Sequence, residues 1–243
     1  SVSERYTTSH GIVIRRFEHT NGDVQVTLLN EHGKWRGIAR KGKKVGGHLG
    51  RLSLFHDVTV QYYKKADEEI VLLTQIQLNG ALPKLSDPSI YPYAHVLAEL
   101  VDALTVDVHI GEQLYEYFAS GLRGLNQHAD PEKVTIVYAW KLLQQAGLSP
   151  RLAKCVKCGS SDVKKFDVAA GGVACQVCNM GIPLSEDVLG DLRTIHTQTI
   201  RQALSQDLHD KRLHWTLLRQ YTTYHVRELH SLQTLPQLVL THA

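Results

Sequence analysis

Short runs of alternating apolar and polar residues fill positions 1–79 of the chain. β-Branched and aromatic residues recur there with a period of two, and turns such as Asn21-Gly22-Asp23 separate the runs, which is the pattern of short β-strands. Strands are predicted over 11–17, 24–29, 35–40, 54–63 and 70–78. Five short strands in one segment favour a small closed barrel of the oligonucleotide/oligosaccharide-binding (OB) type.

The hydrophobic period changes after residues 80–90, a segment with one glycine, two prolines and a Ser-Asp-Pro turn that is predicted to be a linker. Apolar positions then recur at helical spacing, and helices are predicted over 93–106, 112–125, 132–146, 185–204 and 210–230. Residues 231–243 are predicted to form a short tail whose apolar cluster packs against these helices. We therefore predict a multidomain α+β protein in which a five-stranded OB-fold barrel precedes an α-helical domain in two parts, 91–150 and 183–243.

All four cysteines lie between the two helical parts, within residues 151–182, as two Cys-x-x-Cys pairs. The pairs are Cys155 with Cys158 and Cys175 with Cys178. Such spacing supplies the four thiolates that a tetrahedral zinc ion prefers, so an inserted four-cysteine zinc finger with one structural Zn²⁺ is predicted. A site closed by four protein ligands leaves no position for a substrate. Two disulfides, or one redox pair with incidental thiols, are the alternatives.

Glycines fall where such a finger has to turn. Gly159 directly follows the first pair, where a tight turn favours a residue that adopts positive φ. Gly171-Gly172 lies between the two pairs, where a hairpin is expected to reverse direction.

Positive charge is concentrated near the start of the chain. Residues 1–51 carry ten Lys and Arg against four Asp and Glu, whereas the remaining residues carry 17 against 20. This asymmetry points to a polyanion partner for the barrel, although a solvated surface with local excess charge would look the same. The predicted contact residues belong to the third strand and the basic, glycine-rich loop after it: Lys34, Trp35, Arg36, Arg40, Lys41, Lys43 and Lys44.

The loop is no nucleotide-binding P-loop, because no Gly-Lys-Ser/Thr follows its glycines. Trp35 lies between Lys34 and Arg36, and an exposed base-stacking role and a barrel-core role both remain open for it. Phe17 and Phe55 are predicted to lie in the barrel core.

The remaining titratable groups suggest no catalytic centre. His209 and His214 are five residues apart, as are His225 and His230. On a helix this spacing places the two side chains on different faces. We predict surface or interface positions for them. The carboxylates at 67–69 are expected to form a solvated turn. No apolar run of membrane-spanning length occurs, and residues 1–10 lack a signal-peptide pattern, so with thiols in metal spacing a reducing cytoplasm is expected.

Several local strings resemble the bacterial recombination mediator family RecO, most of all its Deinococcus branch. They are Gly11-Ile-Val-Ile-Arg-Arg, Val26-Thr-Leu-Leu, Gly33-Lys34, Ile38-Ala39-Arg40-Lys-Gly, Leu54-Phe55-His56, Gly80-Ala81-Leu82-Pro83, and the segment from Lys141 to Leu148 that leads to Cys155. The order of these blocks, with a barrel first and a finger inside the helical region, covers most of the chain.

The resemblance implies a non-enzymatic DNA-repair factor of the RecF pathway, located in the cytoplasm with the nucleoid. Such proteins bind single- and double-stranded DNA and anneal complementary strands. With RecR they help to load RecA onto DNA coated by the single-strand-binding protein SSB, whose C-terminal tail they contact. The basic loop and the strand before it fall where the family's barrel meets DNA and RecR. Some members lack the cysteines, which implies a structural metal.

Two other classes of protein fit parts of the sequence. A zinc-containing scaffold that binds RNA or other proteins would also need a basic barrel, and competition between RNA and single-stranded DNA separates it from a DNA mediator. An enzyme with its active site in the helical domain is disfavoured, because no Ser/His/Asp, paired-carboxylate or open-metal arrangement occurs at interpretable spacing.

Overall fold

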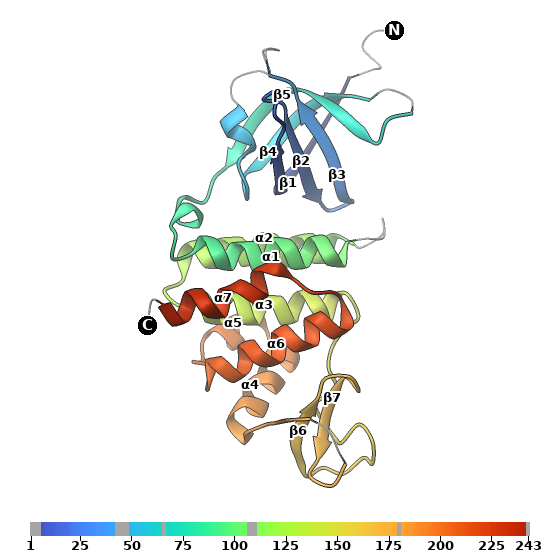
Figure 1. The fold of residues 1–243 in the computed structure, drawn as a ribbon, viewed down its shortest axis with the longest axis vertical. Helices are drawn as coiled ribbons and strands as arrows, with labels where there is room; N and C mark the ends of the chain where they lie inside the picture. Colours follow the sequence, from blue (N-terminus) through green and yellow to red (C-terminus); the bar gives the residue numbers. More distant parts are fainter. Residues whose placement is uncertain (1–5, 42–48, 65–66, 106–110, 179–180, 242–243) are drawn as a thin grey trace.

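The computed structural model describes residues 6–41, 49–64, 67–105, 111–178 and 181–241, with side chains described to residue 235. The molecule is elongated (Figure 1): a β-barrel forms one end, helices fill the middle, and a small sheet with the cysteines forms the other end. The predicted fold class, a five-stranded barrel followed by a helical domain, is confirmed.

The barrel consists of β1 (Tyr6–Glu18), β2 (Val24–Asn30), β3 (Gly33–Ala39), β4 (Asp57–Tyr63) and β5 (Ile70–Gly80). It closes in the order β1-β2-β3-β5-β4, with β3 and β5 parallel and the other described pairs antiparallel. A short 3₁₀ helix, η2 (Leu49–Leu52), precedes β4. This strand order is that of a five-stranded OB barrel.

The alternation of inward-facing and outward-facing side chains shifts in the middle of strand β1. The register with β2 shifts between Val13 and Arg15, which marks a β-bulge. Before the shift Val13 faces the barrel core, and after it Arg15 and Phe17 lie outside. The bulge therefore places Arg15 and Phe17 on the opposite side of the sheet from Val13.

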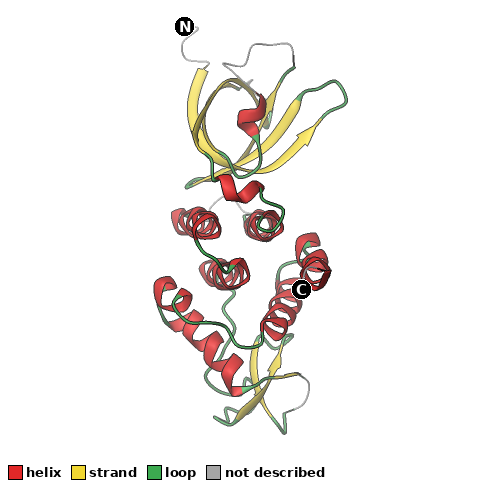
Figure 2. Ribbon diagram, turned by 90° about the vertical axis from the view of Figure 1, so that its left-hand side faces the viewer, coloured by secondary structure: helices red, strands yellow, loops and turns green. Residues whose placement is uncertain are grey.

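The helical domain begins after η3 (Pro83–Ser86). Its helices are α1 (Tyr91–Leu104), α2 (Glu112–Gln127), α3 (Pro131–Gln145), α4 (Glu186–Thr197), α5 (Ile200–Leu204), α6 (Lys211–His225) and α7 (His230–Thr241). Helix α3 is the centre of the domain, because its residues from Lys133 to Leu143 are all buried. Figure 2 shows several helices end-on beneath the barrel.

The C-terminal half differs from the prediction in two places. The helical period predicts one helix over 185–204, but Thr199 and Gln202 form a capping box that separates α4 from α5. It also predicts one helix over 210–230 followed by a short tail, but α6 ends at His225 and the tail forms α7. Leu229, Leu232 and Leu235 are buried in the helical core, so burial of this apolar stripe stabilises the final helix.

The barrel and the helices share one apolar core. Ile12, Ile14, Leu29 and Phe55 of the barrel belong to the same buried cluster as the central helices. Phe55 is buried as predicted, but it lies in this shared cluster and not in the barrel core. Its φ of 69° is unusual for a bulky residue, and backbone hydrogen bonds between the 55–56 segment and Val13 hold it there.

A three-stranded sheet in the order β7-β6-β8 forms the far end of the molecule. It consists of β6 (Val163–Asp167), β7 (Gly172–Cys175) and β8 (Ile182–Pro183). The predicted turns are confirmed, since Gly159 and Gly171 both have φ of 77°. Within the described part of the chain, no helix has the length and apolar character that spanning a membrane requires.

Candidate nucleic-acid interface and metal centre

The outer surface of β1 and β3 carries exposed cations and an aromatic ring. The register pairs Arg15 of β1 with Thr27 of β2, and Thr27 with Arg36 of β3. Phe17 and Lys34 lie two residues from these arginines along their strands, so all four occupy the same face of the sheet. We call this surface the basic face: Arg15, Phe17, Lys34 and Arg36.

The prediction that Phe17 lies in the barrel core is wrong. Its side chain is 61% exposed, and its ring meets the ring of His19 edge-on, with centroids 4.8 Å apart. Arg15, which the sequence analysis did not single out, is also exposed. Both positions follow from the bulge in β1, which reverses the alternation of the strand after Val13.

Lys34 reaches from the barrel to the helical domain. Its Nζ donates to the Oδ1 of Asp102 at 2.8 Å and to the carbonyl oxygen of Asp102 at 3.0 Å. The Nη1 of Arg15 and the Nη2 of Arg227 lie 3.7 and 3.9 Å from Asp102 Oδ2. Three cations from separate elements therefore surround one carboxylate in the last turn of α1.

Two pockets, of about 570 and 600 Å³, lie where the barrel meets the helical domain. The one beside the basic face, which we call the junction pocket, is about 600 Å³ and is lined by Arg15, Thr27, Lys34, Trp35, Arg36, Lys64, Glu69, Asp102 and Thr105. At its rim the Nη2 of Arg36 donates to the Oε2 of the exposed Glu69 at 2.7 Å.

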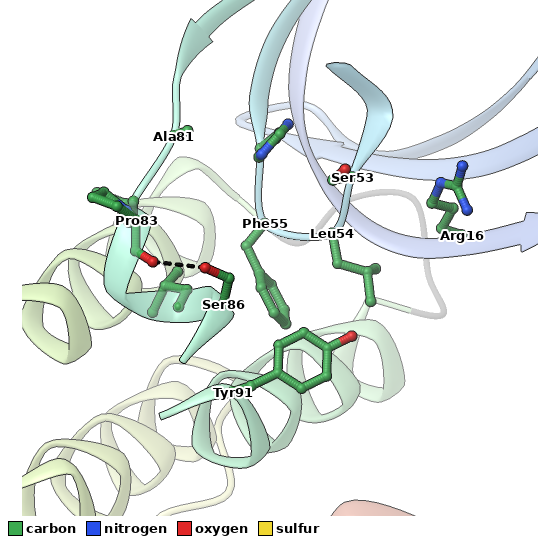
Figure 3. A pocket seen from close by; sticks show the side chains of 11 residues that line it. Arg16, Ser53, Leu54, Phe55, Ala81, Pro83, Ser86 and Tyr91 are labelled. Atoms are coloured by element: carbon green, nitrogen blue, oxygen red, sulfur yellow. Dashed lines mark hydrogen bonds between the residues drawn. The ribbon is translucent and has the colours of Figure 1, made fainter. Parts of the chain in front are cut away.

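The second pocket, about 570 Å³, lies where the barrel meets η3 and α1 (Figure 3). The rings of Phe55 and Tyr91 meet edge-on there, with centroids 5.7 Å apart, and Arg16 also lines the pocket.

The other predicted contact residues lie near the ends of β3. Trp35 is half-buried, packs against the barrel core and stacks at a tilt on Tyr62, with ring centroids 5.4 Å apart. Arg40 and Lys41 are exposed, and the backbone N–H of Lys41 donates to Asp23 in the β1–β2 turn at 2.9 Å. Lys43 and Lys44 lie outside the described residues.

The sulfur atoms of the four cysteines come together between the two Cys-x-x-Cys segments. Their Sγ atoms all lie within 4.8 Å of one another, and those of Cys158 and Cys175 are 3.7 Å apart. A disulfide needs about 2.05 Å, so the predicted alternative of two disulfides is wrong. A tetrahedral zinc ion with Zn–S bonds of about 2.3 Å holds its sulfurs about 3.8 Å apart. The arrangement therefore fits a four-thiolate metal site.

Electrostatics in this cluster also favours a bound cation. Backbone N–H groups of Cys158 and Cys175 lower the pKa of the Cys155 thiol to about 6. In contrast, hydrogen bonding to the sulfurs of Cys175 and Cys158 raises the pKa of Cys178 to about 12. Thiolates this close repel one another, so a metal dication is needed to ionise all four together.

Two of the histidines contact the same carboxylate. The Nδ1 of His209 lies 2.9 Å from Asp191 Oδ1, and the Nε2 of His214 lies 2.9 Å from Asp191 Oδ2. His214 is fully buried, so its predicted surface or interface position is wrong. The helix argument did not apply to this pair, because His209 precedes the start of α6.

Two family models match the chain. "Recombination protein O N terminal" matches residues 5–81, and "Recombination protein O C terminal" matches residues 85–233. The DNA repair protein RecO of Bacillus subtilis is 31% identical over 182 residues, which cover 71% of this chain and 68% of that protein. The DNA repair protein RecO of Desulfatibacillum aliphaticivorans is 27% identical over 256 residues, covering 97% and 98%.

The resemblance to the Deinococcus branch stays a prediction. The two matched segments follow the order barrel, then helices, and together they span most of the described residues. This chain therefore belongs to the RecO family of DNA repair and recombination proteins.

Proposed function

We propose that this protein is a non-enzymatic recombination mediator that binds single- and double-stranded DNA and anneals complementary strands. Together with RecR it would help to load RecA onto DNA coated by SSB, whose C-terminal tail it would contact. The observation that carries the proposal is the basic face, where two exposed arginines and an exposed phenylalanine share one surface of an OB barrel.

Annealing requires little more than such a surface. Cations that neutralise backbone phosphates release counterions and reduce the repulsion between two strands. Stacking of a base on an exposed ring is tolerant of sequence and leaves the pairing edges of the other bases free. Binding is therefore expected to depend strongly on salt and little on sequence.

We further propose that the four cysteines hold one structural Zn²⁺. All four would be thiolate ligands, and the ion would supply no catalytic position because the site is closed. In the proposed division of the chain, residues 1–79 form the DNA-binding domain, 80–90 the linker, 151–182 the zinc finger, and 91–150 with 183–243 the helical domain. The proposed location is the cytoplasm, with the nucleoid.

Fluorescence anisotropy of a labelled single strand, titrated across a salt series, tests the DNA-binding proposal. Arg36→Glu/Lys41→Glu is expected to weaken binding at least tenfold and to reduce the salt slope by about 0.7 for each phosphate that the variant no longer neutralises. Lys154→Glu/Lys164→Glu makes the same charge change on exposed residues of the finger and serves as the matched control.

Annealing of a complementary strand is followed in the same samples without nucleotide. Failure of the unmodified protein to bind at low salt would reject the proposal. Preferential binding of RNA in competition would instead favour the scaffold alternative.

A further inference from the structure

Asp102 is a buried carboxylate in an unusual position. It is 7% exposed, lies in the last turn of α1, and faces the barrel across the boundary with the helical domain. Its nearest cation is Lys34 of β3, and Arg15 of β1 and Arg227, which follows α6, lie within 4 Å. One carboxylate thus neutralises cations that belong to both parts of the molecule.

The junction pocket around Asp102 has a surplus of cations. Four cationic side chains line it, Arg15, Lys34, Arg36 and Lys64, against two carboxylates, Glu69 and Asp102. Glu69 is exposed and pairs with Arg36, whereas Asp102 is buried. Arg15 is 70% exposed in its side chain, so it reaches both the pocket and the open basic face.

The cations around Asp102 are of the kind that bind a phosphate group, and the carboxylate of Asp102 takes the place that a phosphate would have. Phosphate oxygens, like carboxylate oxygens, accept charge-assisted hydrogen bonds from lysine and arginine. The α1 carbonyl that Lys34 also contacts adds the negative end of the helix dipole, which holds Lys34 toward Asp102. Lys34 and Arg15 therefore have an internal anionic partner in place of an external one.

We propose that the junction pocket binds one phosphate of the DNA backbone, and that Asp102 competes with that phosphate for Lys34 and Arg15. This inference rests on the proposed DNA-binding function, and it identifies Asp102 as a residue that sets the affinity for DNA. DNA binding exchanges the Lys34–Asp102 ion pair for a Lys34–phosphate pair. The same exchange loosens one polar contact between the barrel and α1, so occupancy of the pocket is coupled to the barrel–helix boundary.

Asp102→Asn tests the competition, because it removes the charge and keeps the shape. Affinity for a labelled oligothymidylate is expected to rise roughly three- to tenfold at low salt, since the pair that must be broken is only partly exposed to water. The salt slope is expected to stay close to that of the unmodified protein, because Lys34 contacts one phosphate in both complexes. Asp207→Asn makes the same change on a side chain that is 98% exposed in the helical domain, and no effect on binding is expected.

Lys34→Met supplies a second test that does not depend on the stability of the Asp102 variant. It is expected to flatten the salt slope by about 0.7 and to abolish the gain from Asp102→Asn in the double variant. Circular dichroism and thermal melting establish that each variant is folded.

Three outcomes separate the inference from the function on which it rests. If the unmodified protein binds DNA but folded Asp102→Asn binds no more tightly, the competition is rejected and the proposed function stands. If Lys34→Met leaves the salt slope unchanged, Lys34 stays with Asp102 in the complex, and the phosphate site is rejected. If the unmodified protein does not bind DNA, both proposals are rejected.

Discussion

Phe17 is an exposed aromatic ring beside Arg15 on a strongly basic surface. A phenylalanine at this exposure gains little from folding, because most of its apolar area remains in water. On the same face, the arginine and lysine side chains attract phosphates while the ring offers a flat apolar surface to a base. We therefore assign its side chain to the DNA-binding proposal rather than to stability.

Phe17→Ala is expected to weaken binding of single-stranded DNA by about 1–3 kcal/mol, the usual cost of removing one base–aromatic stack. Its melting temperature is expected to change little. Phe17→Leu keeps an apolar side chain without the aromatic face, so it separates stacking from burial. Equal affinity of Phe17→Leu and the unmodified protein would contradict a stacking role.

The positions of Phe17 and Lys34 could not be derived from the sequence. Alternation along β1 places Phe17 inside only if the strand is regular, and a bulge leaves no distinctive residue pattern. The basic stretch predicts Lys34 as a contact residue, but its partner Asp102 is 68 residues away in the chain. The spacing of residues in the sequence predicts which of them share a helix or strand. Contacts between helices and strands can be read only from the packed structure.

Most strands and helices agree with the sequence prediction within a few residues. Period-two alternation located the five barrel strands, and helical spacing located α3, at whose start Asp130 accepts from the N–H of Lys133. The break between α4 and α5 has a sequence signal, the Thr199-x-x-Gln202 capping box, which periodicity alone overlooks. Helix α7 has no such signal, since only burial against the core distinguishes it from a tail.

The cysteine cluster was the most predictable part of the candidate sites, because its ligands come from two local motifs. Metal analysis of the purified protein is expected to give one zinc per chain, and none in Cys158→Ser/Cys178→Ser. The variant is expected to melt at lower temperature, since the finger loses its cross-link. DNA affinity is expected to stay within about twofold if the basic face is the contact surface.

Val177→Ala is the control for the metal experiment. Val177 lies between two of the ligands and is 89% exposed, so both zinc content and melting temperature should be retained. If the metal-free serine variant melted at the same temperature as the unmodified protein, a structural role for the ion would be contradicted.

Several histidines make the stability of the whole molecule depend on pH. Burial lowers the pKa of His95, His196 and His214 below the ordinary 6.5. The unfolded chain then binds more protons than the folded one between those lowered values and about 6.5, so this stabilisation is present at neutral pH and lost on acidification. His209 acts in the opposite sense, because the hydrogen bond with Asp191 raises its pKa.

The melting temperature is therefore expected to fall as the pH is lowered from 7 to about 5.5 at constant ionic strength, because the three histidines that act in this direction are shielded from water, whereas His209 is exposed and its ion pair is screened by solvent. His214→Gln is expected to flatten this dependence, while His32→Gln, which changes a surface ring, should leave it unaltered. A melting temperature that rises on acidification over this range would show that His209 and other groups dominate.

The apolar core that Ile12, Ile14, Leu29 and Phe55 share with the helices has a consequence for how the molecule responds to force and heat. The two family segments meet near residues 81–85, whereas the shared core lies between the barrel strands and the helices. We therefore expect a force on the barrel to be transmitted to the helices through this shared core. The barrel and the helices are accordingly expected to melt in one cooperative transition.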